Sequence, residues 1–335
     1  MRFIACSTAN LSGVGAIVKS IWMLVAWFLM CCPALSQSSA PFADVSSKSA
    51  HDREFWRAIA RNHYAVPEGQ QVFPLLRELS GYVGSRDSEL RDNLGYSITT
   101  VWIKHQKHIS VDELNSLLEE WEANLRVGIG DSPIEESGGE DSKNDAVLKR
   151  SFSALSLVAL AERDLDMPFL SEDRYRTLLA DALAYLKDER DLRGFDPTIG
   201  WIHATAHAAD LLGALARNPL LKPEDQSHIL DAISARLSSA HEIFGFGEQD
   251  RLALAAARIA LRKDFDATEF HAWLNALDAS DERVWKDSPP KLDLLQTFEN
   301  DTYMLRGFAL YLATSPSTPA ITATQNEVLK VLRER

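Results

Sequence analysis

Segments with helical periodicity follow one another along the chain from residue 51 to the C-terminus. Apolar residues recur at three- and four-residue spacings, and helix-stop signals such as Pro67 with Gly69, and Pro219, separate the segments. No alternating run of β-branched residues predicts a strand. The sequence therefore predicts an all-α fold of about twelve helices. We expect them over residues 52–64, 73–83, 86–105, 111–126, 145–163, 171–187, 200–217, 222–239, 247–262, 266–278, 291–313 and 321–334.

The helices pair into about six hairpins of about 47 residues, close to the repeat length of HEAT and armadillo proteins. Three segments share a pattern in which an arginine lies early in a helix whose remainder is mostly apolar: Arg91, Arg150 and Arg251. A helix that is apolar nearly all round must be covered on both sides. We therefore predict an antiparallel helix-pair solenoid of the HEAT/armadillo type, or the same pairs closed into an α/α toroid.

The first 36 residues differ from the rest of the chain. They hold two charged residues, Arg2 and Lys19, and an apolar run over residues 21–35 that leads to small residues before Gln37. This pattern predicts a signal peptide over 1–36 and export to the periplasm or the medium, with a retained membrane anchor as the alternative. A flexible linker over 37–50 and a single α-helical repeat domain over 51–335 follow, with an acidic mobile loop over 130–145.

Cysteine usage and charge exclude several classes of function. All three cysteines lie in the first 36 residues, so a processed chain has no thiolate metal site and no cysteine nucleophile. Loss of Arg2 and Lys19 leaves 33 basic against 48 acidic residues, a net charge of −15. Such a charge opposes nucleic-acid phosphates. The sequence also lacks a phosphate-binding glycine loop, a G-x-S-x-G elbow and a dinucleotide fingerprint.

A polar stripe marks the predicted helix 200–217. His203, His207 and Asp210 are spaced i, i+4 and i+7, so they share one face of an otherwise apolar helix. A buried hydrogen-bonded network, a ligand-facing groove and a divalent metal site such as zinc all fit this pattern. The H-E-x-x-H zinc-peptidase motif is absent because residue 204 is Ala. Trp201, at the start of the same helix, fits either packing against a neighbouring hairpin or stacking on a sugar or peptide.

The arginines at the helix starts allow two interpretations. In the first they pair with nearby carboxylates in a ladder through the core, Arg91 with Asp87 or Asp92 and Arg150 with Asp145. In the second, inner helices of a solenoid line its concave side and bring together a polar ligand-binding or acid–base face. That face would comprise Arg91, Arg150, His203, His207, Glu248 and Arg251.

Four strings of the chain resemble the bacterial family known as domain of unknown function 2785. They are SRDSELRDNLGYSI (85–98), RSFSALSLVALAERD (150–164), DLRGFDPTIGWIHATAHAADLLGAL (191–215) and GEQDRLALA (247–255). The resemblance extends from about Phe55 to about Tyr311 and implies an all-helical, HEAT-like domain. It carries over no reaction, cofactor or catalytic residue. The signal peptide and the enlarged acidic loop before Arg150 depart from the family pattern.

The sequence thus favours an exported α-helical repeat protein that binds a partner on its concave face, either a protein segment or a glycan. The alternative is a helical-toroid hydrolase or lyase acting on glycan. In that case His203, His207 and Asp210, with Arg150 and Glu248 opposite, would perform acid–base chemistry or hold a metal. We predict no cofactor, no nucleic-acid partner, and membrane association only if the N-terminal segment is retained.

Overall fold

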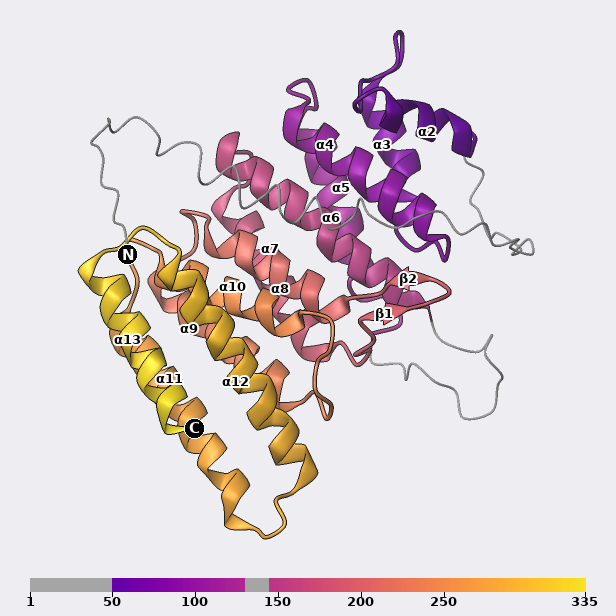
Figure 1. Cartoon of the computed structure of the whole chain (residues 1–335). Helices are drawn as coiled ribbons and strands as arrows, with labels where there is room; N and C mark the ends of the chain where they lie inside the picture. The colour runs from indigo at the N-terminus through magenta and orange to yellow at the C-terminus, as the bar shows by residue number, and fades with distance from the viewer. Residues whose placement is uncertain (1–49, 130–144) are drawn as a thin grey trace, which may run out of the picture. The chain divides into compact units, whose positions relative to one another are not determined.

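The computed structural model describes residues 50–129 and 145–335. Within them the chain forms twelve α-helices, one π-helix, one 3-10 helix and a two-stranded hairpin (Figure 1). The α-helices are α2 (Arg53–Arg61), α3 (Val72–Ser80), α4 (Ser97–His105), α5 (Val111–Asn124), α6 (Ala146–Asp166), α7 (Glu172–Asp188), α8 (Ala204–Ala216), α9 (Pro223–Ser238), α10 (Glu248–Ala260), α11 (Ala267–Asp281), α12 (Leu292–Ala313) and α13 (Pro319–Glu334). The other elements are the π-helix η1 (Glu89–Tyr96), the 3-10 helix η3 (Glu282–Lys286), and strands β1 (Phe195–Asp196) and β2 (Gly200–Trp201).

The all-α prediction is confirmed, and each expected segment contains a helix. Two segments differ from the prediction. Residues 86–105 divide into η1 and α4, and the helix expected to begin at residue 200 begins at Ala204. The predicted signal peptide, linker and acidic loop lie outside the described residues, apart from residues 50 and 145 at their ends. None of the helices in the described ranges is both long enough and apolar enough to span a membrane.

Alternate helices pack side by side. In one series α6 contacts α4 and α8, α8 contacts α10, and α10 contacts α12. In a second series α7 contacts α9, and α11 contacts α9 and α13. We call η1, α4, α6, α8, α10 and α12 the inner helices because they include the most completely buried segments of the chain. Closure of these layers into a solenoid or a toroid stays a prediction.

Small residues let the inner helices approach closely. A Cβ atom added at Gly213 of α8 would lie 3.4 Å from the Cα of Ala255 in α10. A Cβ added at Gly307 of α12 would lie 3.1 Å from the Cβ of Ala253. Because side chains at interfaces interlock at high density, these spacings fix the positions of the inner helices relative to one another.

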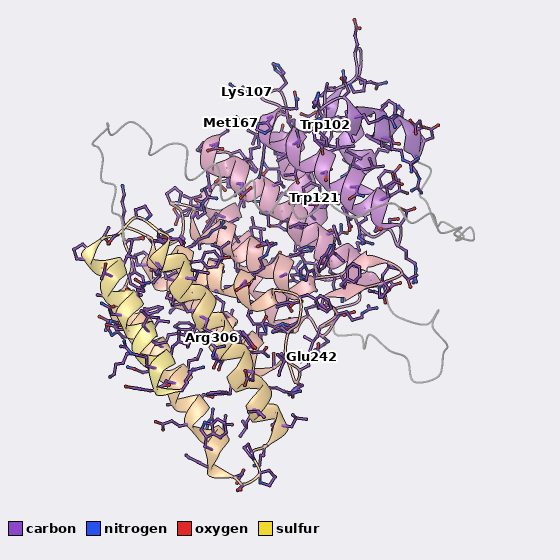
Figure 2. The ribbon with its side chains drawn as sticks, viewed as in Figure 1. Trp102, Lys107, Trp121, Met167, Glu242 and Arg306 are labelled. Atoms are coloured by element: carbon purple, nitrogen blue, oxygen red, sulfur yellow. The ribbon has the colours of Figure 1, made fainter. Side chains whose placement is uncertain are left out.

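Tryptophans anchor the N-terminal helices. Trp102 of α4 and Trp121 of α5 are fully buried and are marked among the first helices in Figure 2. Trp102 Nε1 donates to the Tyr64 backbone oxygen at 2.6 Å, and Trp121 Nε1 donates to Ser80 Oγ at 2.8 Å. Each indole therefore buries its large apolar surface without leaving its N–H unpaired.

The π-helix η1 depends on a glycine. A Cβ at Gly95 would lie 2.7 Å from the backbone oxygen of Leu90 and 3.3 Å from the Cβ of Tyr82. Ser97 Oγ donates to the Asp92 backbone oxygen at 3.1 Å, five residues earlier, which helps to satisfy a carbonyl in the widened turn. Arg91 and Tyr96 both belong to this π-helix. Arg91 lies over the Phe152 ring of α6, and Tyr96 lies close enough to Asp210 of α8 to interact with its charge.

Candidate functional site

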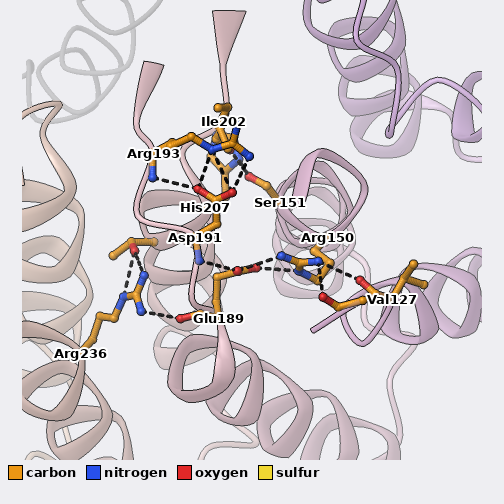
Figure 3. A network of polar contacts seen from close by, with 11 residues as sticks. Val127, Arg150, Ser151, Glu189, Asp191, Arg193, Ile202, His207 and Arg236 are labelled. Atoms are coloured by element: carbon orange, nitrogen blue, oxygen red, sulfur yellow. Dashed lines mark hydrogen bonds and ion pairs between the residues drawn. The ribbon is translucent and has the colours of Figure 1, made fainter. Parts of the chain in front are cut away.

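Arg150, in the first turn and a half of α6, lies in the interior and pairs with Glu189 just after α7 (Figure 3). Its Nε and Nη2 donate to the Glu189 carboxylate at 2.7 and 2.8 Å, and both side chains are 2% exposed. Its Nη1 donates to the backbone oxygens of Val127 and Gly128 at 2.8 and 3.0 Å. The guanidinium therefore joins three segments of the chain and is fully engaged.

The same network fixes the segment that follows α7. The Asp191 amide donates to Glu189 Oε1 at 2.9 Å, and Arg193 forms an ion pair with Asp191 at 2.5 Å. From α9, Arg236 donates to the Glu189 backbone oxygen at 2.7 Å and to Thr205 Oγ1 at 2.9 Å. Because buried charges are costly unless paired and hydrogen-bonded, this segment is held in one conformation.

Arg91 holds the hairpin on the other side. Its Nη2 donates to the backbone oxygens of Ile199 and Trp201 at 2.8 and 3.1 Å, and its Nη1 donates to the Ser85 oxygen at 2.7 Å. Its Nε lies 2.7 Å from Asp92 Oδ1, and the Arg91 side chain is 0% exposed. Asp92 is thus the partner that the ladder interpretation allowed, whereas Arg150 pairs with Glu189 in place of Asp145.

The hairpin explains why α8 starts later than expected. Asp196 Oδ1 accepts hydrogen bonds from the Thr198 and Ile199 amides at 2.8 and 3.2 Å, which forms an Asx turn. Gly200 has φ 79° and His203 has φ 52°, and neither value is compatible with a right-handed helix. Trp201 therefore belongs to β2, and His203 is the N-cap of α8.

His207 lies in the interior beside α6. Its Nδ1 is 2.8 Å from Ser151 Oγ, and Ser151 Oγ donates its hydrogen to the Ile202 backbone oxygen. Nδ1 must therefore donate to Ser151, which leaves the lone pair on Nε2. Burial lowers the pKa of His207 well below its usual value. This histidine is a neutral structural residue.

His203 and Glu248 form a pair at the start of α8 and α10. His203 Nε2 lies 2.9 Å from the Phe246 backbone oxygen and 3.5 Å from Glu248 Oε1. Their side chains are 11% and 2% exposed. Burial lowers the pKa of His203 and raises the pKa of Glu248. Both shifts favour the uncharged forms. Because a backbone oxygen only accepts, His203 Nε2 carries the hydrogen and donates to Phe246, which leaves the lone pair of the neutral ring on Nδ1.

Asp210 pairs with Arg251 and not with either histidine. Arg251 Nη1 lies 3.0 and 2.9 Å from the two Asp210 carboxylate oxygens. Burial raises the pKa of Asp210, and the guanidinium opposes that rise. Asp210 and Arg251 remain 14% and 37% exposed, so this ion pair reaches solvent.

An aromatic cluster lies beside the N-termini of α8 and α10, where His203 and Glu248 are found. It comprises Phe195, Trp201, His203 and Phe246. The rings of Trp201 and His203 are stacked at 4.6 Å, and Trp201 meets Phe195 edge-on at 5.0 Å and Phe246 edge-on at 6.2 Å. Phe195 is 42% and Phe246 48% exposed. The cluster therefore presents apolar ring surface to solvent from a fixed hairpin.

A polar row continues from the cluster across four inner helices. It comprises Tyr96 of η1, Asp210 of α8, Arg251 and Arg258 of α10, and Tyr311 of α12. These groups lie close enough to act on one another electrostatically. Burial raises the pKa of Tyr96 to about 12, and Asp210 raises the pKa of Arg251.

The predicted polar face is thus divided by the structure. Trp201 and His203 lie beside the buried carboxyl group of Glu248, and Asp210 lies with Arg251. Arg91, Arg150 and His207 are enclosed in the interior, as Glu248 is. The sequence interpretation did not include Phe195, Phe246, Tyr96, Arg258 or Tyr311. The seven-residue spacing of Arg251 and Arg258 was the available signal for a shared helix face.

The described residues contain no group of three or more His, Cys, Asp or Glu side chains placed to hold a metal ion. In the proposed set, His207 contacts Ser151 and Asp210 contacts Arg251. Imidazole and carboxylate ligands of a metal must converge on one point. The three side chains have separate partners instead.

Comparison with known proteins gives one family. The family model described as Protein of unknown function (DUF2785) matches residues 138–312, slightly more than half of the chain. The range contains three of the four strings that carry the resemblance and excludes residues 85–98. No curated protein matches the chain, and no solved structure does so.

The buried pair gives a test of stability. Replacing Arg150 by Met should lower the free energy of unfolding by about 3–5 kcal/mol, because Glu189 is left charged and unpaired in the interior. Urea unfolding measures this loss. The matched control is Arg126→Met, whose guanidinium pairs with Asp181 on the surface and is 64% exposed. That change should cost less than about 1 kcal/mol. Equal losses in the two variants would contradict the assigned role.

The low pKa of His207 predicts a pH dependence of stability. The unfolded chain binds a proton at this histidine below about pH 6.5, and the folded chain does not. Above that pH the neutral His207 does not reduce the free energy of unfolding. As the pH falls below it, protonation of the unfolded chain progressively lowers the free energy of unfolding. Between pH 7 and pH 5 the wild type should lose about 1–2 kcal/mol more than His207→Asn, which keeps a donor for Ser151.

The comparison uses the difference between the two proteins because Glu248 and Asp210 act in the opposite direction. Their raised pKa values stabilise the fold as the pH falls, and both groups are present in each protein. Parallel pH profiles of wild type and His207→Asn would show that His207 is not held neutral.

Proposed function

Since the chain belongs to the family described as Protein of unknown function (DUF2785), whose description names no activity, we propose its function from the site: it is a binding module for glycan. The ligand lies on the aromatic cluster and along the polar row. The observation that supports this most is the exposed ring surface of Phe195 and Phe246 around the stacked pair Trp201 and His203. In this proposal the protein is exported, as its first 36 residues predict.

The cluster has the two properties that a sugar site needs. Aromatic rings offer apolar faces against which the C–H groups of a sugar pack, and polar tips supply hydrogen bonds at their edges. Here the imidazole of His203, which is 11% exposed, lies directly beside the rings. The carbonyls of Ile199 and Trp201 are held by Arg91, so the rings are positioned before a ligand arrives. Such preorganisation lowers the entropy lost on binding.

A second function is favoured by the pair His203 and Glu248. A carboxyl group with a raised pKa next to a neutral imidazole is an acid–base couple of the kind that a glycan hydrolase or lyase requires. Glu248 is 2% exposed and His203 11% exposed, so a bound sugar would meet His203 first. The two groups lie 3.5 Å apart at their nearest atoms. Arg150 and Asp210, which the enzyme hypothesis also used, are occupied by Glu189 and Arg251.

The binding proposal predicts a specific loss in Trp201→Ala. Titration calorimetry with neutral oligosaccharides chosen from a glycan array should show at least a tenfold higher Kd, about 1.4 kcal/mol, because a central aromatic contact is removed. The matched control is Trp285→Ala. Trp285 is 61% exposed and packs edge-on against Phe298, outside the aromatic cluster. Its replacement should leave the Kd unchanged.

The same mixtures separate the alternatives. Binding without new products supports the binding module. Cleaved oligosaccharides, detected by mass spectrometry and absent with Glu248→Gln, would replace it by the enzyme. Binding of extended peptides in place of any glycan, or equal affinity of Trp201→Ala and wild type, would contradict the glycan assignment.

A further inference from the structure

Arg258, a half-buried residue of α10, differs from the other buried and half-buried arginines. Each remaining buried or half-buried arginine of the described residues has a hydrogen-bond or ion-pair partner. Arg163 donates to the Gln106 backbone oxygen at 2.9 Å, for example, and Arg262 donates to the Ala216 oxygen at 2.7 Å. Arg258 makes no hydrogen bond or ion pair with any described residue. Its five N–H donors therefore have no protein acceptor there.

The carboxylates around Arg258 are already engaged. Asp210 and Glu162 are the two acids that act on its charge. Both oxygens of Asp210 accept from Arg251, at 3.0 and 2.9 Å. Glu162 forms an ion pair with Lys104 and lies 3.7 Å from Arg217. Within residues 50–129 and 145–335, Arg258 therefore has no counter-ion of its own.

The position of Arg258 is set by α8. A Cβ at Gly213 would lie 3.2 Å from Arg258 Nη1 and 3.5 Å from its Cδ, so the side chain passes directly against this glycine. Burial lowers the pKa of Arg258, and the positive charge of Arg217 lowers it further. An unpaired arginine in this setting attracts an anion more strongly than one in open solvent.

We propose that Arg258 binds an oxyanion, a carboxylate or phosphate group, within the polar row. The planar guanidinium donates two parallel N–H bonds to such a group, which a lysine ammonium cannot do. Arg251, seven residues earlier on the same face of α10, is neutralised by Asp210 and leaves the anion to Arg258. The inference deepens the proposed function and rests on it in one respect: a glycan on the aromatic cluster would reach Arg258 with an acidic sugar.

The distance between the two sites is set by α10. Glu248 begins this helix beside the aromatic cluster, and Arg258 lies ten residues further along. At 1.5 Å per residue the separation along the axis is about 15 Å. An oligosaccharide that stacks at one end and carries a carboxylate at the other can bridge it.

The test uses the full chain at low ionic strength and two probes, inorganic phosphate and oligogalacturonate. Fully methyl-esterified oligogalacturonate serves as the neutral match. Calorimetry should show that Arg258→Met raises the Kd of each anionic probe that binds by at least tenfold. Arg258→Lys, which keeps the charge but not the paired donors, should raise it severalfold. The control is Arg306→Met. Arg306 is an exposed residue of α12 that lies over the Tyr303 ring, and its replacement should leave the Kd unchanged.

The two probes distinguish the sources of the anion. Loss of affinity for both, or for oligogalacturonate alone, supports an acidic glycan. Loss for phosphate alone supports the oxyanion site with a free ion as its ligand. The inference is overturned if wild type binds neither probe, or if Arg258→Met and Arg258→Lys bind both as wild type does.

Failure of this inference and failure of the proposed function give different results. If the methyl ester binds wild type but not Trp201→Ala, and Arg258 variants bind both anions normally, the glycan module stands without an anion site. If Arg258→Met loses phosphate while Trp201→Ala binds the methyl ester as wild type does, the anion site stands alone.

Discussion

The ion pair between Arg150 and Glu189 is the interaction on which the rest of this structure depends. Two charges that are each 2% exposed lie between α6 and the end of α7, where their attraction must offset a large loss of hydration. Further hydrogen bonds help to offset that loss. Arg150 also donates to two loop carbonyls, and Glu189 also accepts a hydrogen bond from the Asp191 amide. Because loss of either charge would leave the other buried and unpaired, the pair fixes the position of the chain at the end of α7. From there the chain leads into the hairpin and not directly into α8.

As a result, the polar groups of the inner helices fall into two sets: those that hold the backbone in the interior and those that remain accessible to solvent. Arginines at the interior, such as Arg91 and Arg236, bind backbone oxygens of the segment between α7 and α8. Their N–H donors are occupied by these backbone oxygens. The groups left with access to solvent are the aromatic cluster, the Asp210–Arg251 pair and Arg258. The buried arginines and their partners thus form a rigid support for side chains that remain partly exposed. This arrangement is expected of a preformed binding surface.

The sequence was sufficient for the helices because their signals are local. Apolar periodicity and stop residues predicted all twelve segments, and the resemblance to the family is confirmed. It was not sufficient for the site, since the site depends on contacts between distant residues. His203, His207 and Asp210 share a helical spacing, yet His203 lies outside the helix. The Asx turn at Asp196, the positive φ of Gly200 and the hydrogen bonds from Arg91 to two carbonyls place it there. Glu189, which ends a helix like many exposed acids, carries no local sign that Arg150 lies opposite, 39 residues away.

Amide hydrogen exchange in the segment after α7 tests this account most directly. In this segment the amides of Asp191, Arg193, Ile202 and His203 donate to acceptors held by the arginine network. We expect these amides to exchange as slowly as amides in the buried helix α8, although most of them lie in no helix. Exchange at the rate of an unstructured peptide, with α8 still protected, would show that the network does not hold the hairpin. The aromatic cluster would then have no fixed support.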